Sequence, residues 1–420
     1  MVNMKFSVGS KEQLISAFTV AAGIVNPAAT TVQEQSIRIS AVIDDDEDSR
    51  LREYIVIESL NTSKCRFVNY IRADIINEGS VNLKGSWINQ IVKVLKSTDV
   101  DTLDIEVSDN KLCFNLGSLG SIDCPISSSQ DDFNPTGLSR RDIVWKPLCK
   151  DNPTITEVLK KGVSYCNKDS LIKIEANKKE STLQIGAKGL VQDFIFFRSS
   201  IEIENDFEFH IYRDIAYAIT QLPSSSVISI YKGERTSGSA FVGDIYRIAC
   251  GLSELVFYGI QDTNDTYKAQ ATFLDLFSIY QLEVNYTQLI NSINIQSFGL
   301  QPHQDISFSI EDGSLLITGE DKTNPAVLSI SSFIPLIDGA EWNEPICFPN
   351  KTLLDLLSAT KANNGLLHLC FKTIEMTMED VEEEEIAEIP KNMNYWLVAY
   401  PSIAYEGGHP FSILPMSAEL

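Results

Sequence analysis

The sequence predicts an α+β fold built from three copies of one domain, each with two helices packed on antiparallel sheets. Three observations support this prediction. A helix followed by alternating strands recurs three times, a second unit of the same kind precedes each copy, and polar, turn-rich segments separate the copies. The 420 residues also exceed what one ordinary core holds, so two or three domains are expected.

The repeat is clearest in KGSWINQIVKVLKSTDVDTLDIEVSDNKLCF (84–114), which reads as a helix and then two strands. The same order occurs in FEFHIYRDIAYAITQLPSSSVISIY (207–231) and in ICFPNKTLLDLLSATKANNGLLHLCF (346–371). These copies lie about 125 to 140 residues apart, which is roughly one domain. Chance similarity within an α+β protein is the alternative, and the threefold match of element order disfavours it.

A second helix precedes each of these units, in SKEQLISAFTVAAGIV (10–25), NPTITEVLKKGVSYC (152–166) and VNYTQLINSINIQ (284–296). Alternating strands punctuated by Gly, Asn and Asp follow each one. Helices are therefore predicted over 11–25, 84–97, 153–168, 211–222, 285–296 and 350–364. The domains are predicted at 1–134, 135–270 and 271–420.

Some segments allow a second interpretation. Residues 14–30 resemble the apolar part of a signal peptide, but Glu12 precedes them and Leu14, Phe18 and Val25 share one helical face, which favours a folded helix. The acidic runs 44–48 and 380–392 are interpreted as solvated loops rather than partner-binding elements. No stretch has the ~18 apolar residues of a membrane span, so no membrane association is expected.

The eight cysteines are scattered without metal-ligand spacing, which predicts reduced core thiols, no metal site and a cytoplasmic protein. The four histidines are isolated, and the sequence has no metalloprotease, phosphate-loop, dinucleotide-binding or nucleophile-elbow motif. No carboxylate pair stands in the apolar setting that acid–base catalysis needs. A catalytic role is therefore disfavoured, and neither catalytic residues nor a cofactor are expected.

Charge is segregated along the chain. The formal net charge is -23, yet the six predicted helices hold ten basic and four acidic side chains. In 84–97, Trp87, Ile88, Ile91 and Leu95 are predicted to be buried, with Lys93 and Lys96 on the opposite face. Helices gathered on one concave side would form a positive surface that contacts the phosphates of a polyanion without reading sequence.

Several segments resemble one known family. These are MKFSVGSKEQLISAF (4–18), IESLNTSKCRFVNYI (57–71), DDFNPTG (131–137), GDIYRIACGLSEL (243–255) and the ending FSILPM (411–416). With the triplicated plan, they are similar to the bacterial DNA polymerase III beta subunit, the DNA sliding clamp. The resemblance implies a non-catalytic processivity factor, a head-to-tail homodimer whose six clamp domains form a ring around double-stranded DNA.

The resemblance also implies partners, namely the replicative DNA polymerase and a clamp loader, and three sets of residues. The DNA-facing set is Lys84, Lys93, Lys96, Lys160, Lys161, Arg213, Lys351 and Lys361. The apolar cleft for partner peptides would contain Leu171, Gly189, Leu190, Leu274, Ile279, Ile413, Leu414, Pro415 and Met416. The dimer interface would pair the strand of Leu112 and Phe114 with the segment of Ile293 and Phe298.

The sequence departs from the family pattern at the cleft, where GAKGLVQ (186–192) replaces the usual ATDGHRL and SAEL follows the terminal PM. An apolar groove remains the expectation. The competing hypothesis is a non-catalytic three-domain scaffold or ring that binds protein partners but not DNA, as the net charge would favour. The two differ in whether replacing the helix lysines weakens DNA association.

Overall fold

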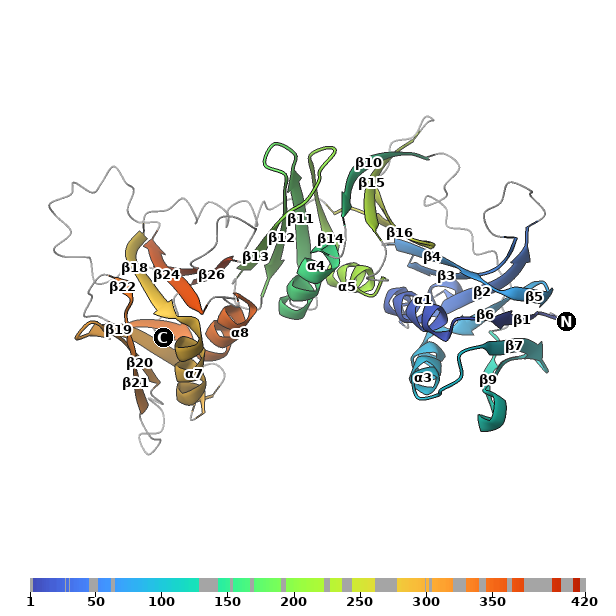
Figure 1. Ribbon diagram of the computed structural model, residues 1–420, viewed down its shortest axis with the longest axis horizontal. Helices are drawn as coiled ribbons and strands as arrows, with labels where there is room; N and C mark the ends of the chain where they lie inside the picture. Colours follow the sequence, from blue (N-terminus) through green and yellow to red (C-terminus); the bar gives the residue numbers. More distant parts are fainter. Residues whose placement is uncertain are drawn as a thin grey trace. The chain divides into compact units, whose positions relative to one another are not determined.

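The structure is a computed structural model (Figure 1) that describes residues 3–26, 28–29, 31–44, 52–61, 65–127, 143–151, 154–166, 170–189, 194–222, 227–235, 244–260, 278–298, 300–301, 304–319, 330–339, 345–360, 365–373, 395–401 and 411–415. The chain divides into two compact units. Unit 1 contains Met1–Lys160 and Ile201–Gln261, and unit 2 contains Lys161–Ser200 and Asp262–Leu420.

All six predicted helices are present, with ends within a few residues of those expected. They are α1 (Lys11–Ile24), α3 (Gly85–Lys96), α4 (Thr154–Tyr165), α5 (Arg213–Thr220), α7 (Tyr286–Ser297) and α8 (Asn350–Thr360). The short helices α2 (Val32–Gln35) and η1 (Gly117–Leu119) were not expected. Side-chain caps fix two starts, since Ser10 accepts a hydrogen bond from the Gln13 amide and Asn285 accepts one from the Gln288 amide.

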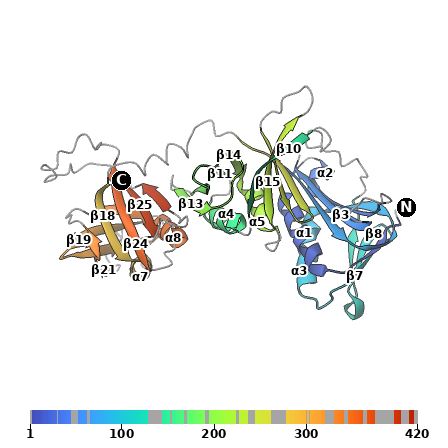
Figure 2. The same ribbon diagram turned by 45° about the horizontal axis from the view of Figure 1, so that its top comes forward.

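Unit 1 contains two antiparallel sheets (Figure 2). The smaller has the order β5 (Asp74–Asn77), β1 (Lys5–Val8), β7 (Leu103–Ser108), β8 (Lys111–Asn115), β9 (Ser121–Pro125). The larger has the order β10 (Ile143–Asp151), β15 (Ile228–Arg235), β16 (Ile245–Cys250), β17 (Ser253–Tyr258), β4 (Cys65–Arg72), β3 (Glu53–Asn61), β2 (Ser36–Ile43), β6 (Gly79–Lys84). Strand β14 (Phe207–Tyr212) precedes α5.

The pairing of β17 with β4 makes the larger sheet continuous across segments far apart in the sequence, from Ser253 opposite Asn69 to Phe257 opposite Cys65. Helix α1 packs on β3 and β4 and beside α3 and α5. Its Phe18 ring meets Phe114 of the smaller sheet edge-on, with ring centroids 6.3 Å apart. Helix α1 therefore joins both sheets of unit 1 in one core.

Unit 2 also contains two antiparallel sheets. The larger includes, in order, β11 (Leu171–Asn177), β12 (Thr182–Lys188), β13 (Phe194–Ser200), β26 (Phe411–Pro415), β25 (Tyr395–Pro401), β24 (Leu366–Thr373), β18 (Ser278–Asn285), β22 (Asp338–Gly339). The smaller has the order β21 (Ile330–Pro335), β20 (Ser314–Gly319), β19 (Asp305–Glu311), β23 (Ile346–Pro349). Leucines and isoleucines of α7 and α8 pack between them, against Phe308, Phe348 and Phe371.

The predicted domain boundaries at 134/135 and 270/271 lie outside the described residues, and so do the acidic run 380–392 and Asp45–Asp48 of the first run. The second predicted domain, 135–270, is divided between the two units. The division into three domains stays a prediction. In the part of the chain that the structure describes, every helix is too short or too polar to cross a bilayer.

Candidate nucleic-acid interface

Helix α3 presents the most basic face in unit 1. Ile88, Ile91 and Leu95 are buried, and Lys93 and Lys96 are exposed on the other side of the helix. Lys84 is also exposed and occupies the N-cap position. Trp87 corrects the sequence prediction, because 39% of its surface is exposed while Val92 takes the buried position. Two lysines in the last turn also offset the partial negative charge of the helix end.

Lys11 looked like another basic residue of the helices, but it has a structural role. Its side chain is buried, and its ammonium group donates a hydrogen bond to the carbonyl oxygen of Thr98, just after α3. Its backbone amide donates to the carbonyl oxygen of Asp101 at 3.1 Å. Lys11 thus ties the start of α1 to the segment that follows α3, and its charge is removed from the exposed surface.

The remaining candidate cations are distributed unevenly. Lys160 and Lys161 are exposed on α4, Arg213 is half-buried on α5, and Lys351 is exposed on α8. Lys361 lies outside the described residues.

Acidic residues offset most of these helix cations. Helices α1, α5 and α8 each carry one basic and one acidic residue, and α7 has no charged side chain at all. The basic surplus that the sequence predicted for six helices is therefore concentrated in α3, with a smaller surplus on α4.

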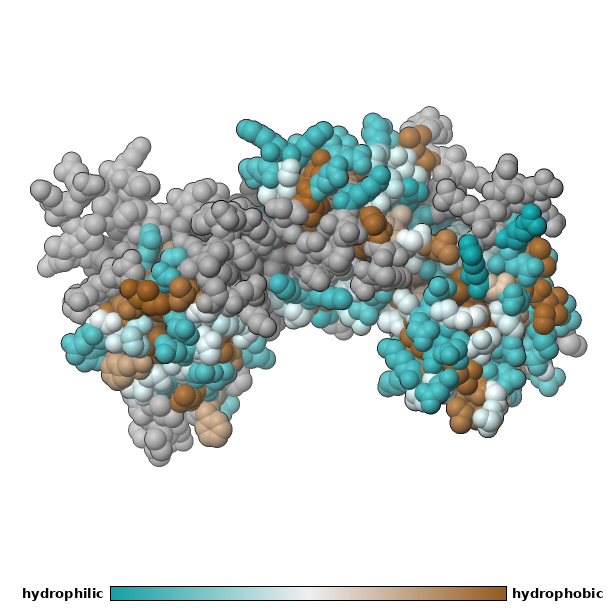
Figure 3. Space-filling model, in the orientation of Figure 1, coloured by the Kyte–Doolittle hydropathy of each residue, from teal (hydrophilic) through white to brown (hydrophobic). Residues whose placement is uncertain are grey.

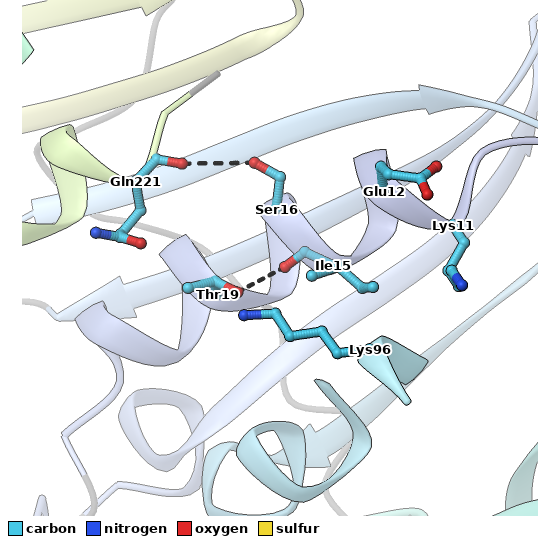
Figure 4. Close-up of a pocket in the computed structure, with 7 residues that line it drawn as sticks. All are labelled: Lys11, Glu12, Ile15, Ser16, Thr19, Lys96 and Gln221. Carbon is cyan, nitrogen blue, oxygen red and sulfur yellow. Dashed lines mark hydrogen bonds between the residues drawn. The ribbon is translucent and has the colours of Figure 1, made fainter. Parts of the chain in front are cut away.

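A groove of about 410 Å³ opens beside α3, between α1 and the end of α5 (Figure 4). It is lined by Lys11, Glu12, Ile15, Ser16, Thr19, Lys96 and Gln221. The Ser16 hydroxyl donates a long hydrogen bond of 3.5 Å to the Gln221 carbonyl oxygen, and the Thr19 hydroxyl donates to the Ile15 carbonyl oxygen at 2.7 Å. No sequence pattern links Ser16 to Gln221, because they lie 205 positions apart.

The candidate cleft residues are described only in part. Leu171 is half-buried at the start of β11, and Gly189 is buried just after β12. Ile413, Leu414 and Pro415 belong to β26, which pairs with both β13 and β25. Ile279 lies in β18, and no side-chain position is described for it or for β26. Leu190, Leu274 and Met416 lie outside the described residues.

The candidate dimer residues fall in two different environments. Leu112, Phe114 and Ile293 are fully buried in the cores of their own units. Strand β8 is paired on one side with β7 and on the other with β9, so it is not the sheet edge that the sequence analysis assumed. Within the described residues the edge of that sheet is β9, whose Cys124 points inward and whose Asp123 is exposed.

Phe298 is the opposite case, because 94% of its surface is exposed just after α7. Ile295 on α7 and Phe333 on β21 are also exposed, and a hydrogen bond of 2.9 Å from Gln296 to Ser332 holds the helix end beside that strand. Strand β21 is an edge of its sheet among the described residues. Phe333 projects from the opposite face of the strand to Ser332 and so lies away from α7. We call Ile295, Phe298 and the backbone edge of β21 the α7–β21 surface. Apolar patches of this kind interrupt the hydrophilic surface in Figure 3.

Comparison with solved structures shows which known proteins share this fold. No family model matches the sequence, and no curated protein matches it. Among solved structures, a DNA polymerase III beta subunit from Thermotoga maritima superposes with a TM-score of 0.75 at 12% identity, over 99% of this chain and 100% of that chain. The subunit beta from Borrelia burgdorferi gives 0.72 at 12% identity over 99% of both chains.

A DNA polymerase sliding clamp from Bacillus subtilis gives a TM-score of 0.71 at 12% identity, over all of both chains. The fold class is therefore that of the bacterial sliding clamps, and it extends over the whole chain. The likeness is one of fold, since the matched sequences share about one residue in eight with this chain.

Proposed function

We propose that this chain is a DNA sliding clamp, a processivity factor that encircles duplex DNA and tethers a replicative polymerase. The strongest support is the whole-length fold match to the beta subunits. The exposed lysines of α3 and α4 add a surface suited to phosphate contacts that are independent of sequence. On this proposal the protein has no reaction of its own, because closure around the duplex makes weak contacts persistent.

The ring would close through two copies of the chain. A strand-edge contact has to use β9 rather than β8, since β8 is already paired on both sides. The complementary contact is the α7–β21 surface, which combines an edge strand with exposed apolar side chains. Joining two such edges would satisfy their unpaired backbone groups and cover Phe298. The homodimer would then have two equivalent interfaces.

Partner peptides would bind in unit 2, near β11 and β26, where the resemblance locates the cleft. Leu171, Gly189, Leu190, Leu274, Ile279, Ile413, Leu414, Pro415 and Met416 remain its proposed lining. A peptide held there raises the local concentration of its polymerase at the primer end. The polymerase and the clamp loader are the proposed protein partners.

The proposal is tested by comparing retention on circular and linear DNA. The protein is loaded onto a nicked circular duplex and onto the same duplex linearised, and the half-life of the complex is measured after dilution. A clamp remains on the circle and leaves the linear form through its ends, so cutting the circle should release it. Equal half-lives on the two forms would refute encirclement.

A scaffold that binds proteins but not DNA is the second candidate, and one observation favours it. Four of the six main helices carry no surplus positive charge, in a chain of net charge -23. For that scaffold, replacing Lys93, Lys96, Lys160 and Lys161 with glutamine would leave DNA association unchanged. The clamp predicts weaker loading, and weaker retention on linear DNA, with the dimer intact.

A further inference from the structure

The groove between α1 and α3 has different charged residues at its two ends. On α1, the lining residues Glu12, Ser16 and Thr19 recur at helical spacing and share the face opposite the buried Leu14 and Phe18. Glu12 is therefore one turn before Ser16 and two turns before Thr19. In Figure 4 the side chain of Lys96 extends alongside α1 with its ammonium group toward Thr19. The Thr19 end of the groove is thus cationic, whereas at the other end Glu12 lies beside Lys11, whose ammonium group is bonded to the Thr98 carbonyl oxygen.

The cationic end also offers neutral hydrogen-bond donors. Ser16 donates at 3.5 Å, well beyond the usual 2.7–2.8 Å for a hydroxyl donor, so its proton is readily redirected to a ligand. The side-chain amide of Gln221 donates to the Thr220 hydroxyl at 3.0 Å, and in Figure 4 its nitrogen points away from Ser16 and Lys96. Thr19 already donates its only proton at 2.7 Å. Lys96 and Ser16 are therefore the donors that an anionic group in the groove would meet.

The size of the groove suits part of a polymer better than a small ion. Its volume of about 410 Å³ equals the liquid volume of roughly a dozen water molecules, far more than a five-atom phosphate fills. The groove is more open than enclosed, and Lys96 is exposed. A phosphodiester with its flanking sugars would occupy such a groove and could leave it sideways along the strand.

We propose that Lys96 and Ser16 form a seat for one backbone phosphate of duplex DNA, and that Glu12 weakens the seat by repelling the neighbouring phosphate charge. This inference rests on the proposed function and adds a regulating element to the DNA-facing surface. A ring that must slide gains from contacts that are easily broken. Repulsion by Glu12 would shorten the time for which Lys96 of α3 holds one phosphate.

The two charged residues give tests of opposite sign. Binding of a short linear duplex is measured by fluorescence anisotropy at several salt concentrations, because this step needs no encirclement. Lys96→Gln should weaken binding roughly two- to fivefold and lower the salt slope by about 1. Glu12→Gln should strengthen binding by about twofold. Ser16→Ala should weaken it without changing the salt slope.

Matched controls separate the groove from general charge effects. Lys111→Gln on β8 and Glu180→Gln in the β11–β12 turn make the same charge changes at exposed positions elsewhere. If these controls reproduce the changes seen for Lys96 and Glu12, the seat is refuted. Melting temperatures of all variants check that folding is intact. A loss of binding on Glu12→Gln would show a cation site instead, which also overturns the proposal.

Chemical protection adds a readout at the site itself. Acetylation of Lys96, followed by mass spectrometry, should slow in the presence of duplex DNA, while acetylation of Lys111 should not. Protection by millimolar inorganic phosphate without protection by duplex would assign the groove to a free anion and overturn the DNA seat.

The two proposals fail in distinguishable ways. If Lys96→Gln and Glu12→Gln have opposite effects but circular and linear DNA are held equally long, the phosphate seat stands and the clamp is refuted. If the protein encircles DNA but neither variant changes binding, the clamp stands and the phosphate seat is refuted.

Discussion

The exposed side chain of Phe298 provides the sharpest test of the proposed dimeric ring. With 94% of its surface in water, the side chain contributes little to the stability of unit 2, so Phe298→Ser should leave the melting temperature nearly unchanged. If the α7–β21 surface forms the dimer contact, full burial of a phenylalanine there is worth about 1.5–3 kcal/mol. The dimer dissociation constant should then rise roughly 10- to 150-fold per interface.

Sedimentation velocity over a range of concentrations measures this shift. The wild-type protein should sediment as a species of twice the 46.8 kDa chain mass, and the variant should dissociate at higher concentrations. Ile293→Ala on the same helix is the matched control, because Ile293 is fully buried and its truncation should cost about 2–5 kcal/mol of unfolding free energy. A Phe298→Ser dimer as tight as the wild type would remove this surface from the interface.

Three further predictions follow from the basic and buried side chains. Replacing Lys84, Lys93 and Lys96 with glutamine should reduce the salt slope of linear-duplex binding by about 3, one unit per lost phosphate contact, and an unchanged slope would remove α3 from the interface. Burial and the neighbouring Asp123 raise the pKa of the Cys113 thiol from 9.0 to about 11. Because the thiolate is the reactive form, alkylation of Cys113 at pH 8 should be about a hundredfold slower than that of an ordinary thiol. Its rate should rise with pH up to about pH 11. Lys11→Met should lower the free energy of unfolding by about 1–3 kcal/mol, measured by denaturant titration, because it leaves a buried carbonyl oxygen unpaired.

The sequence predicts the elements of this fold well because each carries its own periodic signal. Ile88, Ile91 and Leu95 recur at helical spacing, and the alternating burial in β3 and β19 follows the period of a strand. What the sequence does not predict is which strand is the edge of a sheet. Leu112 and Phe114 have the pattern of any half-buried strand, and only the pairing of β8 with β9 shows that the edge lies one strand further on.

The charge of the residues predicted the exposed basic surface less well than periodicity predicted the helices and strands. A lysine in a helical segment counts as basic whether it faces solvent or a carbonyl group, and Lys11 faces the carbonyl of Thr98. Trp87 was likewise assigned to the core because it shares helical spacing with Ile91 and Leu95, whereas Val92 completes the buried face. The donors of the groove come from Ser16 on α1 and Lys96 on α3, so no local pattern could have joined them.

The uneven charge of the helices has a consequence for how a clamp of this kind would hold DNA. Among the helices that the structure describes, only α3 and α4 carry a basic surplus, so the number of phosphates neutralised at one time would be small. Binding to linear DNA should then be weak at physiological salt, because affinity falls steeply with salt and begins from few contacts. Retention on a closed circle needs no such contacts, since leaving requires an interface to open. The lifetime on circular DNA should therefore depend on salt only as far as the dimer interface does, and Phe298→Ser should shorten that lifetime while Lys96→Gln leaves it nearly unchanged.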